Sequence, residues 1–510
     1  MNLLIRFIFV FVTSKFIRLK DELFFNDLNF RRLDFTNYKQ VKSFIFKKDF
    51  YRLNNDHINT FEFLNYSQNL GGKIGISLSR NSIIKWYANN KNKIFHPWTG
   101  DNTSKRLINI IYNYDFITSS SSETEIKTLK KIILVHIYRT IQDFKFKDLN
   151  EISSYDIIAN TLSNLILKKK FNSHKSYIEI IINTQVDKLG MHKTYNILEH
   201  AKFLNNLYEL KNIFLYFKIK IPKKIEEVVI KMTSILNEYF HLDGTIPLFN
   251  GANNNYTKII YETLNTDDYL IKRTFSSINN GIAFFSDKNK KLFFDVVQPN
   301  KKGVSKNLNA GTLSFEFSSM GEKIITNCGA SEAQGKNPGY LRYSAAHSTI
   351  ILQNTNISEI KEKNPHIKFP QSVTFLANTI PGYKIYEGSH NGYQNKFNRI
   401  IKRKIKICDT ENKIFGEDSI ISIKNIGDKI IYHIRFHLTS ELVFNFTNNR
   451  KNIILRTKLK NMWLFKSDIE LEVEDSIIVD KNRTTPSKQI VIKGITNKNK
   501  TVRRWSLEKI

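Results

Sequence analysis

Cysteine is scarce in this sequence, since the 510 residues contain only Cys328 and Cys408. Two thiols allow at most one disulfide, so the chain carries neither a disulfide framework nor a thiolate metal cluster. Whether the two cysteines pair is left open by their positions. Cysteine usage therefore excludes the small, disulfide-stapled class of secreted domains.

Long apolar runs are also lacking. The first twenty residues are rich in apolar side chains, but Arg6 interrupts them, and a transmembrane helix needs roughly 20 consecutive apolar residues. No small-residue cleavage site follows Val12, so a first amphipathic or buried segment is favoured over a signal peptide. The chain also lacks the GxGxxG and GxxxxGK[ST] patterns that bind nucleotide phosphates.

Positive charge, in contrast, is abundant: 78 Lys and Arg against 47 Asp and Glu give a formal net charge of +31. Such a charge favours polyanionic partners, namely nucleic acid, an anionic membrane surface or an acidic polysaccharide. Codon drift in an AT-rich genome explains the same composition equally well. Because no zinc-finger spacing or RNP motif accompanies the charge, nucleic acid is the weakest of these readings.

Before about residue 265, apolar residues recur at helical spacing. Ile197, Ala201 and Leu204, at steps of four and three, predict one buried helix face. Helices are predicted over 129–144, 155–171, 176–186, 194–214 and 221–240. Several helices of similar length joined by short loops indicate helical hairpins that form a bundle or a toroid.

After residue 265, short strands follow one another, separated by turns rich in Asn, Gly, Lys and Asp. In one of them, Leu313, Phe315 and Phe317 alternate with polar residues, which predicts a strand with one buried face. Many strands at short spacing predict a large antiparallel β-sandwich. We therefore expect a multidomain α+β protein with an N-terminal segment over 1–80, a helical domain over 81–265 and a β-sandwich domain over 266–510.

Polar residues suited to chemistry gather around the predicted domain boundary. In chain order they are His192, Tyr195, Asn250, Tyr256, Asn307, Asn309, Asn327, Arg342 and His347. Each has an ordinary structural explanation when taken alone. A histidine at a helix start is usually a cap, asparagine runs are usually turns, and a histidine before an apolar strand is usually a hydrogen-bonded core residue.

The combination of segments is more specific. A helical domain followed by "NAGTLSFEFSSMGEKIITNCGA" and "RYSAAHSTIIL" resembles the heparinase II/III-like polysaccharide lyases. The resemblance extends from about residue 80 to residue 495, and its most specific parts are "AGTLSFEF" and "AAHST". It implies an (α/α) toroid followed by an antiparallel β-sandwich, with the substrate cleft between them. It also implies β-elimination on a uronic-acid-containing anionic polysaccharide, no cofactor that carries electrons, and a periplasmic or cell-envelope location. Because no clear signal peptide is present, a cytoplasmic location stays open.

The resemblance also assigns roles to individual residues. It implies catalytic roles for His192, Tyr256 and His347, with Tyr195 as a rival to Tyr256. The residues expected to bind substrate are Tyr195, Asn250, Asn307, Asn309 and Arg342. A catalytic tyrosine would need cationic surroundings to lower its pKa from the usual value of about 10.

The sequence departs from the family where many members read His-x-His-Ala, because residues 307–310 here read Asn-Leu-Asn-Ala. The resemblance places a catalytic histidine at Asn307 and metal ligands at Asn309, Asn327 and His347. Neutral amides are poor zinc ligands, so we expect no structural zinc. Two hypotheses follow: a lyase that relies on His192 and a tyrosine, or a non-catalytic protein that binds acidic polysaccharide or assists envelope assembly. The oligomeric state is not indicated.

Overall fold

The computed structural model describes residues 55–149, 151–167, 175–265, 281–298, 308–330, 339–360, 368–424, 429–447, 449–480 and 483–510, together with residues 42, 45 and 47. The chain divides into two compact units. Unit 1 consists of Met1–Gln185 and Phe203–Val229, and unit 2 consists of Val186–Lys202 and Ile230–Ile510. The sequence-based domain boundaries at residues 80 and 265 stay a prediction, and most of the 1–80 segment lies outside the described residues.

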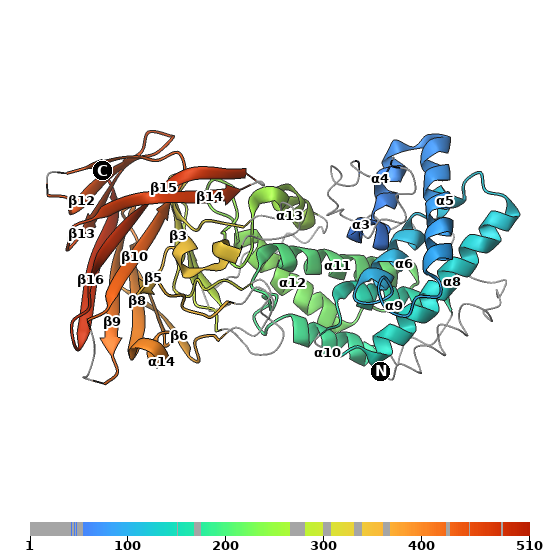
Figure 1. The fold of residues 1–510 in the computed structure, drawn as a ribbon, viewed down its shortest axis with the longest axis horizontal. Coiled ribbons are helices and arrows are strands. Elements are labelled where there is room, and N and C mark those ends of the chain that lie inside the picture. Colours follow the sequence, from blue (N-terminus) through green and yellow to red (C-terminus); the bar gives the residue numbers. More distant parts are fainter. Residues whose placement is uncertain are drawn as a thin grey trace. The chain divides into compact units, whose positions relative to one another are not determined.

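Helices occupy the described chain before residue 265 (Figure 1). They are α3 (Asp56–Asn59), α4 (Phe63–Leu70), α5 (Gly72–Asn90), α6 (Asn102–Tyr112), α7 (Tyr114–Thr118), α8 (Glu123–Phe146), α9 (Ser154–Ile166), α10 (Lys175–Gln185), α11 (Ile197–Tyr216), α12 (Lys223–Glu238), η3 (Asn254–Tyr256) and α13 (Thr257–Leu264). The division between the units passes through α11 and α12. None of the described helices combines the length and the apolar character that a membrane crossing requires.

The predicted helices are confirmed, with shifted ends. Helix α8 begins earlier than predicted because Ser122 and Glu125 form a capping box at its N-terminus. Within unit 1, one apolar core joins α5, α6, α8 and α9, where Ile83, Leu107 and Ile133 are fully buried. The apolar spacing read from the sequence thus marks the faces that pack inward.

Strands occupy unit 2 after residue 281, in two antiparallel sheets (Figure 1). The first sheet contains β1 (Ile282–Ser286), β2 (Lys290–Asp295), β3 (Phe315–Ser319), β4 (Glu322–Thr326), β10 (Ile431–Leu438), β15 (Arg483–Ile495) and β14 (Glu472–Asp480) in this order, and β5 (Ile350–Leu352) pairs with β10. The second sheet contains β11 (Val443–Phe446), β12 (Asn452–Arg456), β13 (Met462–Ser467), β16 (Lys500–Lys509), β9 (Lys413–Ser422), β8 (Arg399–Cys408), β7 (Tyr383–His390) and β6 (Val373–Ile380). The short helix α14 (Gln394–Phe397) lies between β7 and β8 in the chain.

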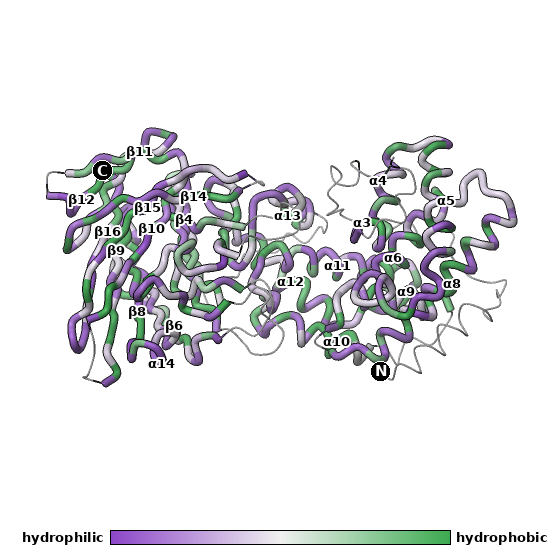
Figure 2. The backbone as a smooth tube through the Cα atoms, viewed as in Figure 1, coloured by the Kyte–Doolittle hydropathy of each residue, from purple (hydrophilic) through white to green (hydrophobic). Residues whose placement is uncertain are grey.

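The two sheets share one apolar core, as the predicted sandwich requires. The ring of Phe315 in the first sheet stacks on Trp505 in the second, with 5.4 Å between the ring centroids. Phe436 and Phe465 meet edge to face across the same core at 5.0 Å. Apolar and polar residues alternate along the strands, which can be followed in the hydropathy colouring of Figure 2. Cys328 and Cys408 are both buried and unpaired.

Strand β3 differs from the prediction in two ways. It begins at Phe315 rather than Leu313, because Leu313 has a φ of 63°, in the left-handed region that ends an extended strand. Both of its faces are buried, whereas the sequence predicted one. We call the face that carries Glu316 and Ser318, opposite the core residues Phe315 and Phe317, the outer face of the first sheet. A segment of unit 2 packs on it, as described below.

A buried ion pair between Arg403 and Asp418 stabilises the β-sandwich. Arg403 in β8 donates from Nε and Nη2 to the carboxylate of Asp418 in β9, at 2.6 and 2.9 Å. Its Nη1 donates to the backbone carbonyls of Leu313 and Ser348. Both charged side chains are fully buried. Arg403 thus ties the second sheet to the two chain segments that flank the candidate site.

We expect Arg403→Met to lower the free energy of unfolding by about 3–5 kcal/mol, because it leaves the buried carboxylate of Asp418 without its charge partner. Denaturant titration measures the change. The matched control is Arg504→Met. This change breaks the ion pair between Arg504 in β16 and Glu417 in β9, in which the arginine side chain is 72% exposed. Arg504→Met should lower the free energy of unfolding by at most about 1 kcal/mol. Equal losses in the two variants would contradict the assigned role of Arg403.

Candidate active site

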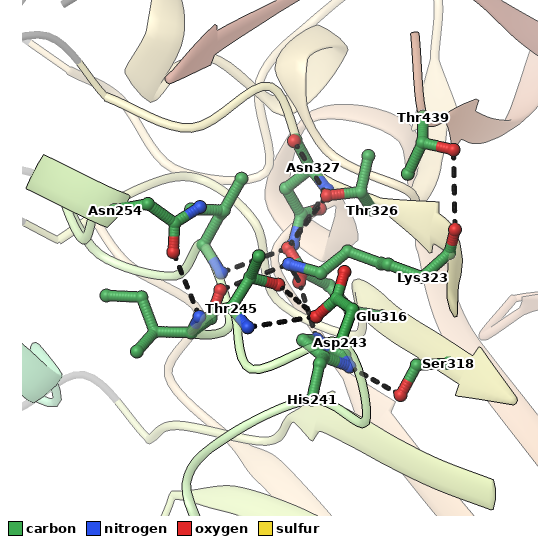
Figure 3. Close-up of polar contacts among 12 residues, drawn as sticks. His241, Asp243, Thr245, Asn254, Glu316, Ser318, Lys323, Thr326, Asn327 and Thr439 are labelled. Carbon is green, nitrogen blue, oxygen red and sulfur yellow. Dashed lines mark hydrogen bonds and ion pairs between the residues drawn. The ribbon is translucent and has the colours of Figure 1, made fainter. Parts of the chain in front are cut away.

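Glu316 lies at the centre of a buried polar cluster on the outer face of the first sheet (Figure 3). Its Oε2 accepts from Nε2 of His241 at 3.0 Å and from Nζ of Lys323 at 3.1 Å. Its Oε1 accepts from the backbone N–H groups of Leu248 and Asn327 and from the side-chain amide of Asn327. Such a density of donors is what a fully buried carboxylate needs to remain charged.

The charges in this cluster follow from its contacts. Burial alone would raise the pKa of Glu316, but Lys323 and the hydrogen bond from His241 outweigh it and hold the pKa at about 2. Burial, reinforced by Lys323, lowers the pKa of His241 to about 4. At neutral pH the cluster therefore contains an ionised Glu316–Lys323 pair and a neutral imidazole. The neutral ring donates from Nε2 to Glu316, and its Nδ1 accepts from the Ser318 hydroxyl at 2.9 Å.

These bonds hold residues 239–254, which we call the covering segment, on the first sheet. Besides His241, the backbone of the segment contributes the N–H of Leu242 to Ser318 and the carbonyl of Ile246 to Lys323. The ring of Phe293, on the outer face of β2, packs edge to face against His241 at 4.8 Å. Buried polar and aromatic contacts together explain why the outer face of β3 is not exposed.

An asparagine cluster follows from the position of the covering segment. Asn250 lies in it, with a φ of 52°, and its Oδ1 accepts from the backbone N–H of Asn309 at 3.2 Å. Its carbonyl accepts from the side chain of Asn196 at 2.9 Å, and its Nδ2 donates to the carbonyl of Tyr195 at 3.4 Å. Asn196 also caps α11, since its Oδ1 accepts from the N–H of Leu198. Asn250 therefore joins three segments that are distant in sequence.

Two features of the cluster are unusual. Tyr195 has a φ of 50°, a conformation that bulky residues rarely adopt and that concentrates at functional sites. The Oδ1 of Asn309 is buried and has no hydrogen-bond partner among the described residues, although buried acceptors are normally paired.

The phenol of Tyr195 keeps its proton more tightly than an ordinary tyrosine. Burial raises its pKa to about 12, and the carboxylates of Asp187 and Asp295 add to the shift. Its ring lies on Gly281, where a Cβ would come within 2.5 Å of the ring. Tyr195 therefore lacks the lowered pKa that a catalytic tyrosine base would need, chiefly because it is buried. The side chain of Tyr256, the predicted catalytic tyrosine, lies outside the described residues, although its backbone belongs to η3.

His192 lies before α11 in the same unit. Its Nδ1 contacts the hydroxyl of Thr194 at 2.8 Å, and its backbone N–H donates to Nδ1 of His200 at 3.3 Å. Nε2 of His200 in turn donates to the carbonyl of Met232 at 2.9 Å. Burial lowers the pKa of His192 to about 3, so the ring is neutral near pH 7. When its Nδ1 carries the proton and donates to Thr194, Nε2 is the basic nitrogen.

Arg342 and His347 lie on one loop, residues 339–349, which packs on residues 308–311. The guanidinium of Arg342 donates to the carbonyl of Leu308 at 3.0 Å, and the backbone N–H of Ala310 donates to the carbonyl of Arg342. The ring of His347 lies so close to Gly311 that a Cβ there would be 3.0 Å from its Cγ. Neither ring nitrogen of His347 has a hydrogen-bond partner among the described residues. Burial lowers its pKa to about 4.

The residues that the resemblance places at metal positions do not fit zinc. The set holds one imidazole, His347, and two neutral amides, Asn309 and Asn327, whereas Zn²⁺ prefers imidazole, thiolate or carboxylate donors. Asn327 is also engaged, since its Oδ1 accepts from the N–H of Ser348 and its Nδ2 donates to Glu316. Within the described ranges, no group of three or more His, Cys, Asp or Glu side chains could hold a metal ion.

The structure brings together many of the residues singled out in the sequence. Asn250 bonds to both Tyr195 and Asn309, while Arg342 and His347 contact the chain on either side of Asn309. Asn307 lies outside the described residues. The roles assigned to all of these residues stay predictions.

Sequence reasoning missed the central group of the site, formed by Glu316, His241 and Lys323. Glu316 alternates with phenylalanines and looked like the solvent side of a strand. One signal was available: Glu316 and Lys323 flank the tight turn at Met320 and Gly321, so an antiparallel hairpin places a carboxylate and an ammonium on one face.

Comparisons with known proteins agree with this architecture. Residues 275–506 match the family model described as Heparinase II/III-like, C-terminal. A solved structure of heparinase III gives a TM-score of 0.69 at 11% identity, covering 98% of this chain and 88% of that chain. Heparan sulfate lyase HepC from Pedobacter heparinus gives 0.63 at 13% identity, covering 90% and 77%. No curated protein sequence matches the chain. The predicted resemblance is confirmed, as is the predicted fold of an (α/α) toroid followed by an antiparallel β-sandwich.

We expect Glu316→Gln to destabilise the protein by about 3–5 kcal/mol near neutral pH, because Lys323 loses its buried counter-charge. The difference in unfolding free energy between the wild type and Glu316→Gln should become smaller as the pH falls below 4.5. An ordinary glutamate takes up a proton near that pH in the unfolded chain, whereas the pKa of Glu316 in the folded chain is about 2. Its contribution is therefore present above pH 4.5 and is lost toward pH 2.

Denaturant titrations of the wild type and the variant at several pH values between 3 and 7 test this expectation. Glu262→Gln is the control, because that side chain is 45% exposed in a helix-surface pair with Lys258. A Glu316→Gln loss that stays constant with pH would show that the charge of Glu316 does not stabilise the fold.

Proposed function

Because residues 275–506 form a heparinase II/III-like C-terminal domain, we propose that the protein is a polysaccharide lyase. Its substrate is an anionic polysaccharide that contains uronic acid, and its reaction is β-elimination. The net charge of +31 supports an anionic partner through long-range attraction. The proposed location, the periplasm or cell envelope, rests on the nature of that substrate.

The reaction sets clear demands on the site. The C5–H bond next to the uronate carboxylate breaks, and its electrons form the C4–C5 double bond as the C4–O bond to the next sugar breaks. Polar donors must stabilise the charge that develops on the carboxylate. A base takes the C5 proton and an acid protonates the departing O4. The elimination needs no oxidant and no reductant, because the electrons of the C5–H bond form the new double bond.

The observation that carries the proposal is the junction at Asn250. Its side chain bonds to the backbone of Tyr195 and to the backbone of Asn309. In the proposed mechanism, amide groups of this cluster and the guanidinium of Arg342 receive the uronate carboxylate and hydroxyl groups.

Proton transfer is assigned to His192 and a tyrosine. The neutral His192 serves as the base that takes the C5 proton. The raised pKa of Tyr195 suits an acid that donates a proton to O4 rather than a base. Tyr256, the tyrosine favoured by the resemblance, is the second candidate for that acid. His347 is enclosed against Gly311, and we assign it a positioning role for residues 308–311.

We expect the purified protein to generate ultraviolet absorbance from unsaturated uronate on at least one acidic polysaccharide of a panel that includes heparan sulfate, heparin, chondroitin and alginate. His192→Ala should lower kcat/KM at least about 100-fold, the usual contribution of general acid–base catalysis. The activity should survive a chelator, since the donor set does not fit zinc.

His433→Ala is the matched control, because this half-buried histidine lies on β10 outside the described cluster. Tyr195→Phe and Tyr256→Phe identify the acid, since the larger loss in kcat marks the tyrosine that donates the proton. Full activity in His192→Ala would overturn the assignment of the base. Binding to an acidic glycan without any new double bond would instead support the non-catalytic polysaccharide-binding protein.

A further inference from the structure

The second sheet turns a partly exposed, cationic face away from the core of the sandwich. Along β8, the buried residues Arg403 and Ile405 alternate with Lys402, Lys404 and Lys406, which are partly exposed. Because successive side chains of a strand point to opposite faces, the three lysines form one row. The strand register continues this face over β7, β9, β16 and β13. We call it the outer face of the second sheet.

Cationic side chains outnumber carboxylates on this face. Among the described residues of these five strands, the outward carboxylates are Glu387, Glu417 and Glu508. Each of them is already engaged by a cation of a neighbouring strand. The ion pairs are Lys402–Glu387 at 2.6 Å, Arg504–Glu417 at 3.0 Å and Lys413–Glu508 at 2.6 Å. Lys466 in β13 is a second cation on Glu508.

Lys404 and Lys406 have no carboxylate partner in the described part of the chain. In the strand register, Lys404 lies between Glu387 on β7 and Glu417 on β9. Both carboxylates are bound to other cations, Lys402 and Arg504. The two ammonium groups on β8 are therefore the part of this face that has positive charge to offer an anionic partner.

Aromatic rings lie beside the unpaired lysines. Phe415 on β9 is directly opposite Lys406, and the ring of Tyr383 on β7 lies 6.2 Å from that of Phe415. The Nζ of Lys406 is 5.0 Å from the centroid of Tyr383, and the Nζ of Lys413 is 4.8 Å from that of Phe415. These cation–π contacts keep the ammonium groups next to apolar area. A sugar ring that carries an acidic substituent offers complementary surface for both.

The pattern of charge on this face distinguishes between classes of polyanion. Duplex DNA carries one negative charge per roughly 1.7 Å of its axis, so its phosphates would also meet Glu387 and Glu417 as like charges. An acidic polysaccharide carries neutral hydroxyl groups between its charges, and a hydroxyl can donate a hydrogen bond to a carboxylate. Interspersed lysines and glutamates therefore suit an acidic polysaccharide better than a nucleic acid.

We propose that the outer face of the second sheet is a second binding surface for acidic polysaccharide, with Lys404 and Lys406 as the contacts for its carboxylate or sulfate groups. The choice of polymer rests on the proposed function. The outer faces of the two sheets point away from each other, so a short oligosaccharide bound near Asn250 does not contact this surface. A long chain bound here keeps its other segments near the candidate site and raises their local concentration.

The test uses the full-length protein with His192→Ala, and ultraviolet absorbance confirms that the polymer stays intact. The probes are fluorescein-labelled heparan sulfate, which carries sulfate and carboxylate groups, and alginate, which carries carboxylate groups alone. Lys404→Gln combined with Lys406→Gln should weaken polymer binding about fivefold, the effect of two lost exposed charge contacts. With His192 restored, the same double variant should lower kcat/KM on the polymer by a similar factor and leave kcat/KM on a tetrasaccharide unchanged.

The matched control is Lys223→Gln combined with Lys258→Gln, because both lysine side chains are 88% exposed on helices and the same two charges are removed. Equal weakening in the two double variants would show an effect of net charge alone and would overturn the proposal. Unchanged polymer binding in the Lys404 and Lys406 double variant would also overturn it. A short DNA duplex that binds more tightly than both polysaccharides, and loses its binding in that variant, would assign the surface to nucleic acid instead.

The unsaturated-uronate assay separates this proposal from the proposed function. Elimination together with polymer binding that does not depend on Lys404 and Lys406 refutes the second surface alone. Polymer binding that depends on the two lysines, without elimination on any polysaccharide of the panel, supports the surface and refutes the lyase.

Discussion

The ionised carboxylate of Glu316, buried on the outer face of the first sheet, is the constraint on which the site depends. A charge in that place is tolerable only with a full set of donors, and they come from two sources. Lys323 belongs to the sheet, whereas His241 belongs to the covering segment. Satisfying the carboxylate therefore fixes the covering segment on the sheet. That position places Asn250, which in turn orients Tyr195. The arrangement of the chemical groups is thus a consequence of one electrostatic requirement.

Local patterns revealed much of this architecture in advance, because periodicity depends on neighbours in the chain. The helical spacing of Ile197, Ala201 and Leu204 marks a buried face, and all three are buried in α11. The covered face of β3 was not predictable in the same way, since what packs on Glu316 comes from about seventy residues earlier in the chain. The lowered pKa that a catalytic tyrosine base would need is not found at Tyr195, because burial, and to a smaller extent the nearby carboxylates, raise its pKa.

The two amide side chains at Asn309 and Asn327 have different contacts in the structure. Asn327 is committed to the fold, with its side chain shared between Glu316 and Ser348. The Oδ1 of Asn309, in contrast, is buried without a hydrogen-bond partner among the described residues. The first amide is therefore part of the structural network around Glu316, whereas the second is not.

The covering segment also determines how this protein can be divided. The family domain matches from residue 275, but residues 239–254 shield Glu316, Ser318 and Phe293. A gene fragment that begins at residue 275 would leave an ammonium and a carboxylate, together with an aromatic face, exposed to water on the first sheet. The smallest unit that keeps these groups buried is therefore longer than the matched domain, because it must include residues 239–254.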